Sequence, residues 1–311
     1  MLKPIALLTF ALTMWAAEGV AEEPALDSGN SAKTRTEMTI RKTVQEVRLG
    51  FQVSSRDGHA LLDARPEQFS VFQDGQKITN VTGFYADHDL PLRVLLMIDA
   101  SDSMTKGFAS EREAAIDFLQ RIVRPRMDES AVVIFSTQME MGSSKESGEQ
   151  KLQRISVLRS SGLTALYDAI CRVGEALPTH DPEYPPARRL LVLLSDGNDT
   201  YSMHSLKDAI AAAQRAELVV YAIAAHKPSE YRSGDANLTK LAEATGGRVL
   251  FLKKYDQSEK VFAEIEEEIR AQYTVTFRTS GDVCGFHRLE IRPEDGSLKI
   301  RARAGFYGDC R

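Results

Sequence analysis

The spacing of hydrophobic residues divides the chain into three stretches. Every second residue from Val47 to Val53 is apolar, which predicts a strand with one buried face. Turn signals at Arg56–Gly58 and Gln73–Gly75 lie next to further short strands such as Phe69–Phe72. Residues 41–88 are therefore predicted to form a small region of antiparallel β-structure.

From residue 92 onward, continuous apolar runs replace the alternation. Strands buried on both faces of a parallel sheet have this composition. Between the runs, apolar residues recur with helical spacing, as they do over Ala115–Ile122. The predicted fold class for residues 89–271 is therefore α/β, a doubly wound, mostly parallel, Rossmann-like sheet with helices on both faces. The apolar runs are Val94–Ile98, Ala131–Phe135, Leu190–Leu194, Leu218–Ile223 and Val249–Leu252.

Alternation returns after this stretch. Apolar residues alternate over Tyr273–Phe277, and two further strands are predicted on either side of the turn Pro293–Gly296. Neither flanking β-region is large enough to bury a core alone. We therefore expect residues 41–88 and 272–311 to pair into one small antiparallel β-domain.

The first residues have the pattern of an export signal. Lys3 precedes the mostly apolar run Ile5–Ala17, and Gly19–Ala21 offers small residues for cleavage. Residues 1–21 are therefore predicted to be a signal peptide, followed by a flexible leader at residues 22–40. The run is short for a spanning helix, so the alternative of an uncleaved anchor is less favoured. We expect a secreted or periplasmic protein with no membrane span in the mature chain.

Charge and cysteine content exclude some functions. The net charge of the 311 residues is −5, and no basic run exceeds two residues, so nucleic-acid binding is not expected. Cys284 and Cys310 lie in the same C-terminal stretch and could form a disulfide in an exported protein, whereas Cys171 is expected to be a buried thiol. Neither the cysteines nor the histidines have zinc-site spacing.

Oxygen-bearing side chains follow three of the predicted strands or connections. Asp99, Ser101 and Ser103 come directly after the first buried strand, Thr164 lies in a later strand–helix connection, and Asp196 follows another buried strand. Ligands of doubly wound sheets bind at the carboxyl ends of the strands. Two carboxylates and three hydroxyls are hard ligands, which suit Mg²⁺ first and Mn²⁺ or Ca²⁺ as alternatives.

These five residues resemble the metal-ion-dependent adhesion site of von Willebrand factor type A and integrin I domains. The resemblance covers roughly residues 92–272, and the flanking segments are similar to a bacterial exported VWFA-related family. It implies that the hydroxyls of Ser101 and Ser103 bind the ion directly and that Thr164 joins directly or through water. It also implies that Asp99 and Asp196 act mostly through bound water or hydrogen bonds.

Other interpretations of these residues remain open at this point. Asp102 could face the ion and favour Ca²⁺, or it could face solvent, and the residues that follow the strand could simply cap a helix. The S-x-x-K pattern at Ser103–Lys106 lacks the companion motifs of penicillin-binding enzymes, and Ser101 stands where a dehalogenase-like phosphatase needs a second Asp. No enzymatic activity is predicted.

The sequence favours an adhesion-type module that binds another protein. Hydroxyl ligands leave much of the charge of the cation uncompensated, so an Asp or Glu of a protein ligand would complete its shell. Peripheral charges such as Asp199 and His204 could then set specificity. One alternative is a scaffold subunit of an envelope assembly with a structural metal, and a further one is a metal-dependent hydrolase.

Overall fold

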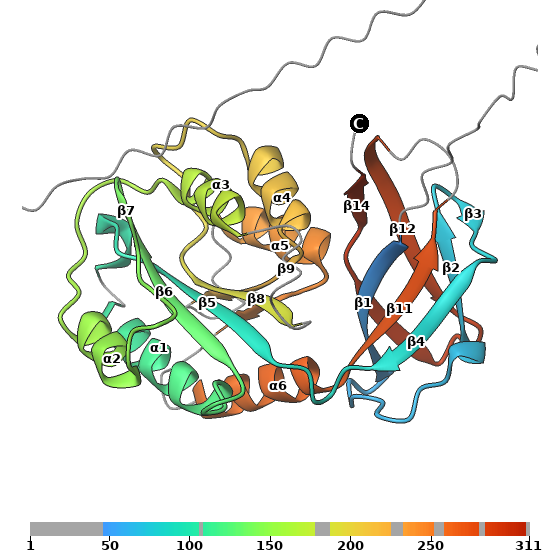
Figure 1. The fold of residues 1–311 in the computed structure, drawn as a ribbon. Coiled ribbons are helices and arrows are strands. Elements are labelled where there is room, and N and C mark those ends of the chain that lie inside the picture. Colours follow the sequence, from blue (N-terminus) through green and yellow to red (C-terminus); the bar gives the residue numbers. More distant parts are fainter. Residues whose placement is uncertain are drawn as a thin grey trace, which may run out of the picture. The chain divides into compact units, whose positions relative to one another are not determined.

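The computed structural model describes residues 46–105, 108–177, 187–224, 233–251, 258–279 and 284–308 (Figure 1). All of them belong to one compact unit, Lys42–Arg311. The predicted signal peptide and the predicted leader both lie outside the described residues. No helix in the described part is both long and apolar enough to span a membrane.

A six-stranded sheet forms the centre of the α/β domain. Its strand order is β10-β9-β8-β5-β6-β7, with all neighbours parallel except β7, which pairs antiparallel with β6. Continuous apolar sequence buries both faces of the central strands β5, β6, β8 and β9, as the sequence predicts. The strands are β5 (Leu92–Asp99), β6 (Glu129–Phe135), β7 (Met139–Met141), β8 (Arg188–Leu194), β9 (Leu218–Ala224) and β10 (Val249–Phe251).

Helices cover both faces of this sheet, so the predicted fold class is confirmed. One apolar core joins β5 to α1, α2 and α6, and a second core on the opposite face joins the sheet to α3, α4 and α5 (Figure 1). The helices are α1 (Phe108–Ile122), α2 (Gly148–Ser156), α3 (Leu166–Ala176), α4 (Leu206–Arg215), α5 (Asp235–Thr245) and α6 (Ser258–Arg270).

The segments before and after the α/β domain form two antiparallel four-stranded sheets, with the orders β13-β1-β11-β4 and β14-β12-β2-β3. Strand β1 pairs with β11, so that Val47 lies opposite Phe277 and Phe51 opposite Tyr273. The predicted pairing of the two flanking segments is therefore confirmed. The strands are β1 (Glu46–Ser55), β2 (Phe69–Gln73), β3 (Gln76–Lys77), β4 (Val81–Ala86), β11 (Gln272–Arg278), β12 (Gly285–Pro293), β13 (Leu298–Ala302) and β14 (Gly305–Gly308).

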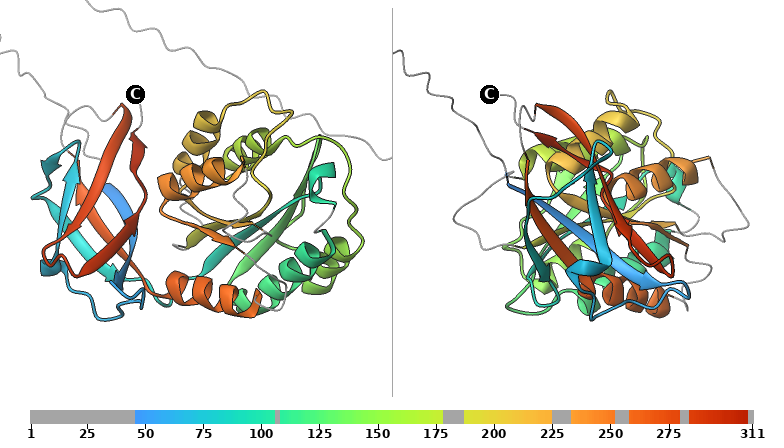
Figure 2. Two further views of the ribbon diagram at one scale, coloured as in Figure 1. Left: turned by 180° about the vertical axis from the view of Figure 1, so that it is seen from behind. Right: turned by 90° about the vertical axis from the view of Figure 1, so that its right-hand side faces the viewer.

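The two sheets share one apolar core. The alternating residues of β1, from Val47 to Val53, are all buried in it, together with Val275 and Ile291 from strands of the two different sheets. We call this part of the molecule the β-sandwich. The two further views in Figure 2 show its strands from other sides.

The strands on either side of the Pro293–Gly296 turn do not form a hairpin. Strand β12 pairs with β2 and β14, whereas β13 pairs with β1 in the other sheet. By crossing between the sheets at this turn, the chain turns apolar residues from β12 and β13 toward the same core. A hairpin would have left the outer edge of β1 without a partner.

Ion pairs lie where the α/β domain meets the two connections to the β-sandwich. The buried Asp128 accepts hydrogen bonds from the N–H of Leu92 (2.8 Å) and from the Arg124 guanidinium, and Arg270 lies 3.6 Å from it. Two residues earlier in α6, Glu268 pairs with Arg301 of β13 at 2.7 Å. The last turn of α6 is therefore fixed by charges from both parts of the chain.

The structure describes two of the three cysteines. Cys171 is a free, buried thiol, as predicted, and burial raises its pKa to about 11. Cys284 is disulfide-bonded. Cys310 lies outside the described residues.

Candidate metal centre

The carboxyl end of β5 places Asp99 in the interior. Its side chain has no exposed surface, and both carboxylate oxygens accept hydrogen bonds. The N–H of Ser101 donates to Oδ1 (3.0 Å), and the hydroxyl of Ser195, which follows β8, donates to Oδ2 (2.7 Å). Asp99 therefore links the loop after β5 to the loop after the neighbouring strand.

Ser101 and Ser103 point their hydroxyls toward each other. Their Oγ atoms lie 3.0 Å apart, close enough to face one small ion together. Ser101 stands at the N-cap of a short 3₁₀ turn, Asp102–Met104, but its side chain makes no capping hydrogen bond. Capping therefore does not account for Ser101, and the side chain of Asp102 is exposed to solvent.

The loop before α3, which we call the second loop, is hydrogen-bonded through its backbone to the first loop, which follows β5. The N–H of Ser161 donates to the carbonyl of Ala100 (2.7 Å), and the N–H of Asp102 donates to the carbonyl of Gly162 (2.9 Å). Gly162 has a φ of +85°, and an added Cβ would come within 2.6 Å of Thr137 Oγ1, so glycine is required there. This backbone path leads to Thr164, which is buried at the start of α3.

The loop that follows β8, which we call the third loop, is hydrogen-bonded to Thr164. The N–H groups of Thr200 and Tyr201 both donate to the carbonyl of Thr164, at 2.9 and 3.0 Å, and the N–H of Thr164 donates to Thr200 Oγ1. In the same loop, Asp196 is 7% exposed and accepts the N–H of Asn198 with Oδ1. Its Oδ2 accepts no hydrogen bond within the described residues.

The environment of Asp99 disfavours its charged form. Burial raises the pKa of Asp99 to about 6; hydrogen bonds from Ser101 and Ser195 oppose that rise, and repulsion from Asp196 adds to it. The two carboxylates are thus near enough to repel each other. A divalent cation between the loops would remove this penalty.

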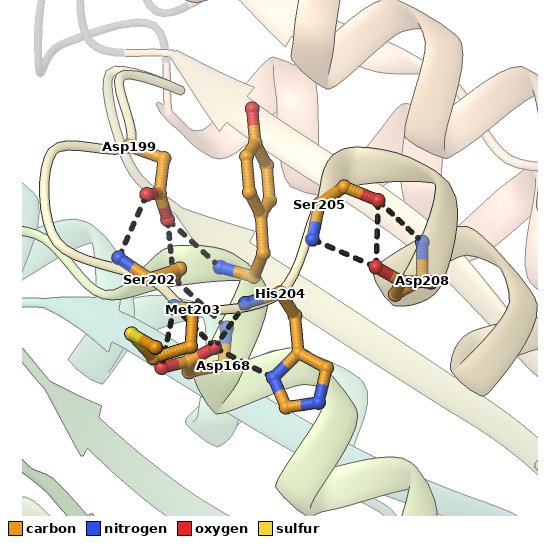
Figure 3. Close-up of polar contacts among 8 residues, drawn as sticks. Asp168, Asp199, Ser202, Met203, His204, Ser205 and Asp208 are labelled. Atoms are coloured by element: carbon orange, nitrogen blue, oxygen red, sulfur yellow. Dashed lines mark hydrogen bonds and ion pairs between the residues drawn. The ribbon is translucent and has the colours of Figure 1, made fainter.

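Two further carboxylates, those of Asp199 and Asp168, form hydrogen bonds that link the third loop to α3 (Figure 3). Asp199 accepts the N–H of Tyr167 and both the N–H and the hydroxyl of Ser202. Asp168 accepts the N–H groups of Met203 and His204, and its Oδ1 lies 2.7 Å from the Nδ1 of the His204 ring. Asp199 and His204, which the sequence suggested as specificity charges, are thus engaged within the protein.

Apolar side chains are exposed in the second and third loops, next to these hydrogen bonds. Leu163 precedes Thr164 and is 50% exposed, and Tyr201 is 52% exposed. Met203, whose N–H is held by Asp168, is 92% exposed. A fixed backbone with exposed apolar side chains is typical of surfaces that bind other proteins.

The donor set fits a small hard cation. The described residues contain no group of three or more His, Cys, Asp or Glu side chains placed to hold a metal. An ion here would use hydroxyl oxygens, one or two carboxylates and water, which suits Mg²⁺ because it keeps several waters, rather than the carboxylate-rich cage that Ca²⁺ prefers. The structure brings all five predicted residues to one edge of the sheet, on three loops joined by hydrogen bonds.

Comparison with protein families identifies the α/β domain. The model of the von Willebrand factor type A domain matches residues 94–264, from β5 into α6. The chain belongs to the von Willebrand factor type A family. VWA domains are generally interaction modules.

The solved structures that resemble this chain are similar to it at low sequence identity. Proximal thread matrix protein 1 from the mussel byssus is 15% identical, with 64% of this chain and 50% of that chain covered and a TM-score of 0.48. A von Willebrand factor type A protein from Catenulispora acidiphila is 13% identical, with 86% and 75% covered and a TM-score of 0.47. The D319A mutant of the PilB minor pilin from Streptococcus sanguinis is 15% identical, with 58% and 62% covered and a TM-score of 0.44. The chain spans about half the length of the mussel protein, and no curated protein sequence matches it.

The structure adds residues that sequence reasoning missed. Ser195 holds Asp99 from the neighbouring strand, and Asp168 holds the third loop from α3. A signal for Ser195 was present, because β5 and β8 end at the same edge of the VWA sheet and Ser195 directly follows β8. Nothing in the sequence marks Asp168, since its partners lie more than thirty residues away.

Proposed function

We propose that this VWA protein binds another protein through a divalent cation, Mg²⁺ in the first place, held by Asp99, Ser101, Ser103, Thr164 and Asp196. The observation that carries the proposal is the convergence of three hydrogen-bonded loops on paired hydroxyls beside two mutually repelling carboxylates. The ion would supply a positive charge at a surface from which Asp99 itself is excluded.

Each residue has a distinct part in this proposal. Ser101 and Ser103 face the ion with neutral oxygens, and Asp99 holds Ser101 and Ser195 in position through its two hydrogen bonds. Neutral ligands leave the cation electrophilic, so an Asp or Glu of the partner is favoured as the last ligand. The exposed side chains of Leu163, Tyr201 and Met203 then offer apolar contact around that carboxylate.

Calorimetric titration of the purified protein with Mg²⁺, Mn²⁺ and Ca²⁺ tests the metal site. We expect saturable binding to one site, weakened about 10- to 100-fold in Asp99→Asn, because this variant keeps the size and much of the hydrogen bonding of Asp99 but removes its charge. The exposed turn residue Asp57 provides the matched control, and Asp57→Asn should bind the ion like wild type. Equal affinity in wild type and Asp99→Asn would contradict this ligand set.

Cation-dependent capture tests the binding role. Partner proteins should be retained on the immobilised protein in Mg²⁺ and released by a chelator, and capture should fail with Asp99→Asn. A partner retained equally in Mg²⁺ and in chelator would point instead to a scaffold with a structural metal. We place the protein outside the cytoplasm on the strength of residues 1–21, and mass spectrometry of the N-terminus of the exported protein would test that placement.

A further inference from the structure

Residues of β2, of β4 and of the segment around β3 line one pocket of the β-sandwich. A cavity of about 200 Å³ opens there. An apolar cavity of about 150 Å³ can hold benzene, so this one has room for one large apolar side chain. Its apolar lining includes Phe51, Phe69, Val71, Ile78, Val81 and Phe84.

Aromatic rings form the walls of this cavity. Phe69 and Phe84, from opposite sheets, stack with their ring centroids 6.1 Å apart, and Phe51 meets Phe69 edge to face at 5.4 Å. These contacts pack the aromatic side chains of the two sheets against each other in defined positions. The cavity is therefore a built feature of the core with a mouth at the edge of the β-sandwich.

Strand β4 forms one side of that mouth and has a free edge within the described residues. It pairs only with β11, with Tyr85 opposite Thr274 and Phe84 opposite Val275. The N–H of Asp87 donates to the carbonyl of Gln272. Because main-chain groups alternate along an antiparallel ladder, those of Phe84 and Ala86 point away from β11, toward the open side.

A β-bulge brings this free edge and the cavity together. The register with β11 shifts between Thr276 and Phe277, so that Thr82 is the extra residue on β4. The shift lets Val81 and Phe84 both line the cavity although they are three residues apart. An added strand on β4 would thus lie directly across the mouth.

The edge lacks most of the usual protection against such pairing. Proteins commonly place charged residues or proline on an exposed edge strand, and Val81–Ala86 contains neither. On the other side of the mouth, β3 is only two residues long. An unprotected edge beside a pocket with apolar walls and a polar rim is an arrangement by which domains bind extended peptides, with the backbone pairing and one side chain filling the pocket.

The charged residues at the mouth indicate which residue type should stand next to the apolar side chain in a bound peptide. Glu67, Lys77 and Glu294 line the rim, and all three are exposed. Glu294 also accepts a hydrogen bond from the hydroxyl of Ser70. Two acidic groups against one basic group favour a peptide with Lys or Arg next to its apolar anchor.

We propose that β4 and the adjoining cavity bind an extended segment of a partner protein, which pairs with the outward-facing main chain of Phe84 and Ala86. A bulky aromatic or aliphatic side chain of this segment enters the cavity, and a neighbouring Lys or Arg lies near Glu67 and Glu294. This site does not depend on the metal centre.

A phage-displayed library of random 12-residue peptides, selected on the full chain in a metal chelator, tests the proposal. Chelation separates this site from the metal centre, so either proposal can fail without the other. We expect the selected peptides to share an alternating strand-like pattern with one bulky apolar position flanked by a basic residue. Their affinities are then measured by fluorescence polarisation with labelled synthetic copies.

Two variants of β4 act on the two parts of the site. Val81→Trp should fill the mouth, and Ala86→Pro should remove an outward-facing N–H without loss of a bond to β11. Each should weaken binding about tenfold. The matched control, Val157→Trp, changes an exposed valine in the α/β domain and should leave the affinity unchanged. Circular dichroism checks that all three variants fold.

Three outcomes would overturn the proposal. The first is a selection in chelator that yields no peptide with the expected pattern. The second is selected peptides that bind both β4 variants as tightly as the Val157→Trp control. The third is a hydrogen-exchange measurement in which the bound peptide slows amide exchange in the α/β domain and not in β4.

Discussion

The VWA domain and the β-sandwich bury their apolar side chains in different ways. In the VWA domain, strands with continuous apolar sequence are covered by helices on both faces, and the polar residues of the candidate site are mostly buried at the strand ends. In the β-sandwich, alternating strands build one core whose aromatic side chains leave a cavity at one edge. The candidate site of the VWA domain is made of polar side chains at the strand ends, whereas the proposed site of the β-sandwich uses apolar side chains of its core.

The two parts also differ in the sequence separation of the contacts that hold them. The sheet of the VWA domain joins strands from one continuous stretch of the chain. In the β-sandwich, Glu46 pairs with Arg278, so its central pairing depends on segments from opposite ends. Variants in each part can therefore test whether packing, charge and ligand act separately in the two.

Truncation of one phenylalanine in each core should give the largest contrast. Phe118 of α1 is fully buried against Phe262, with ring centroids 5.4 Å apart, and Phe118→Ala should lower the free energy of unfolding by about 4 kcal/mol. Phe84 is only partly buried beside the cavity, and Phe84→Ala should cost about 2 kcal/mol. Urea denaturation measures both values, and equal losses would contradict the difference in packing.

Charge at the junction gives the next test. Asp128→Asn should lower the free energy of unfolding by about 3 kcal/mol at pH 7, because Arg124 and Arg270 lose a buried partner. Asp57→Asn, in an exposed turn, is the matched control and should change stability little.

The effect of Asp128 should depend on pH. Burial alone would raise the pKa of Asp128, but hydrogen bonds from Arg124 and from the N–H of Leu92 outweigh it and lower the pKa below its usual value. The folded state therefore binds this proton less tightly than the unfolded state, so the stabilisation is present above about pH 4 and is lost as the pH falls further. The difference between wild type and Asp128→Asn should narrow in acid, and a difference independent of pH would contradict this role.

Magnesium should stabilise one part and not the other. At 100 times its dissociation constant, the ion would add about 2.7 kcal/mol to the stability of the domain that binds it. Hydrogen exchange should slow in the three loops around Asp99, Thr164 and Asp196 and stay unchanged in β4. Equal slowing in β4 would show that the two parts respond as one.

A helix cap in the VWA domain should give the smallest effect. Ser205 caps α4, where its hydroxyl accepts the N–H of Asp208 and the Asp208 side chain accepts the N–H of Ser205. Ser205→Ala should cost about 1 kcal/mol in thermal or urea unfolding. Ser297→Ala, in an exposed turn of the β-sandwich, provides the comparison and should cost less.

Elements that depend on local sequence patterns could be predicted, whereas the pairing of β12 and β13 with strands distant in the sequence could not. The buried runs such as Val94–Ile98 and the alternation in β1 are local patterns, and each became the strand it predicted. Strand β7 spans three residues and helix α2 nine, and neither contains a long apolar run, so the sequence analysis did not predict them. The separation of β12 from β13 was missed because a turn signal shows where the chain reverses and not which sheet the next strand joins.

The candidate site divides in the same way. The five candidate ligands could be proposed from sequence because each lies at a strand end or beside a helix start. They are Asp99, Ser101, Ser103, Thr164 and Asp196. Whether they bind a cation stays a prediction. The supports of the site could not be found, since Ser195 reaches Asp99 only because β5 and β8 are neighbours.

The pairing of β1 with β11 has a consequence during synthesis. The ribosome makes β1 and β4 before residues 87–271, and β11, which lies between these two strands in the sheet, comes only afterwards. At roughly 5–20 residues per second, the apolar face of β1 waits on the order of ten seconds or more for its partner. The nascent β-sandwich therefore depends on the VWA domain to emerge first, and a chaperone that holds extended apolar segments would protect β1 in the interval.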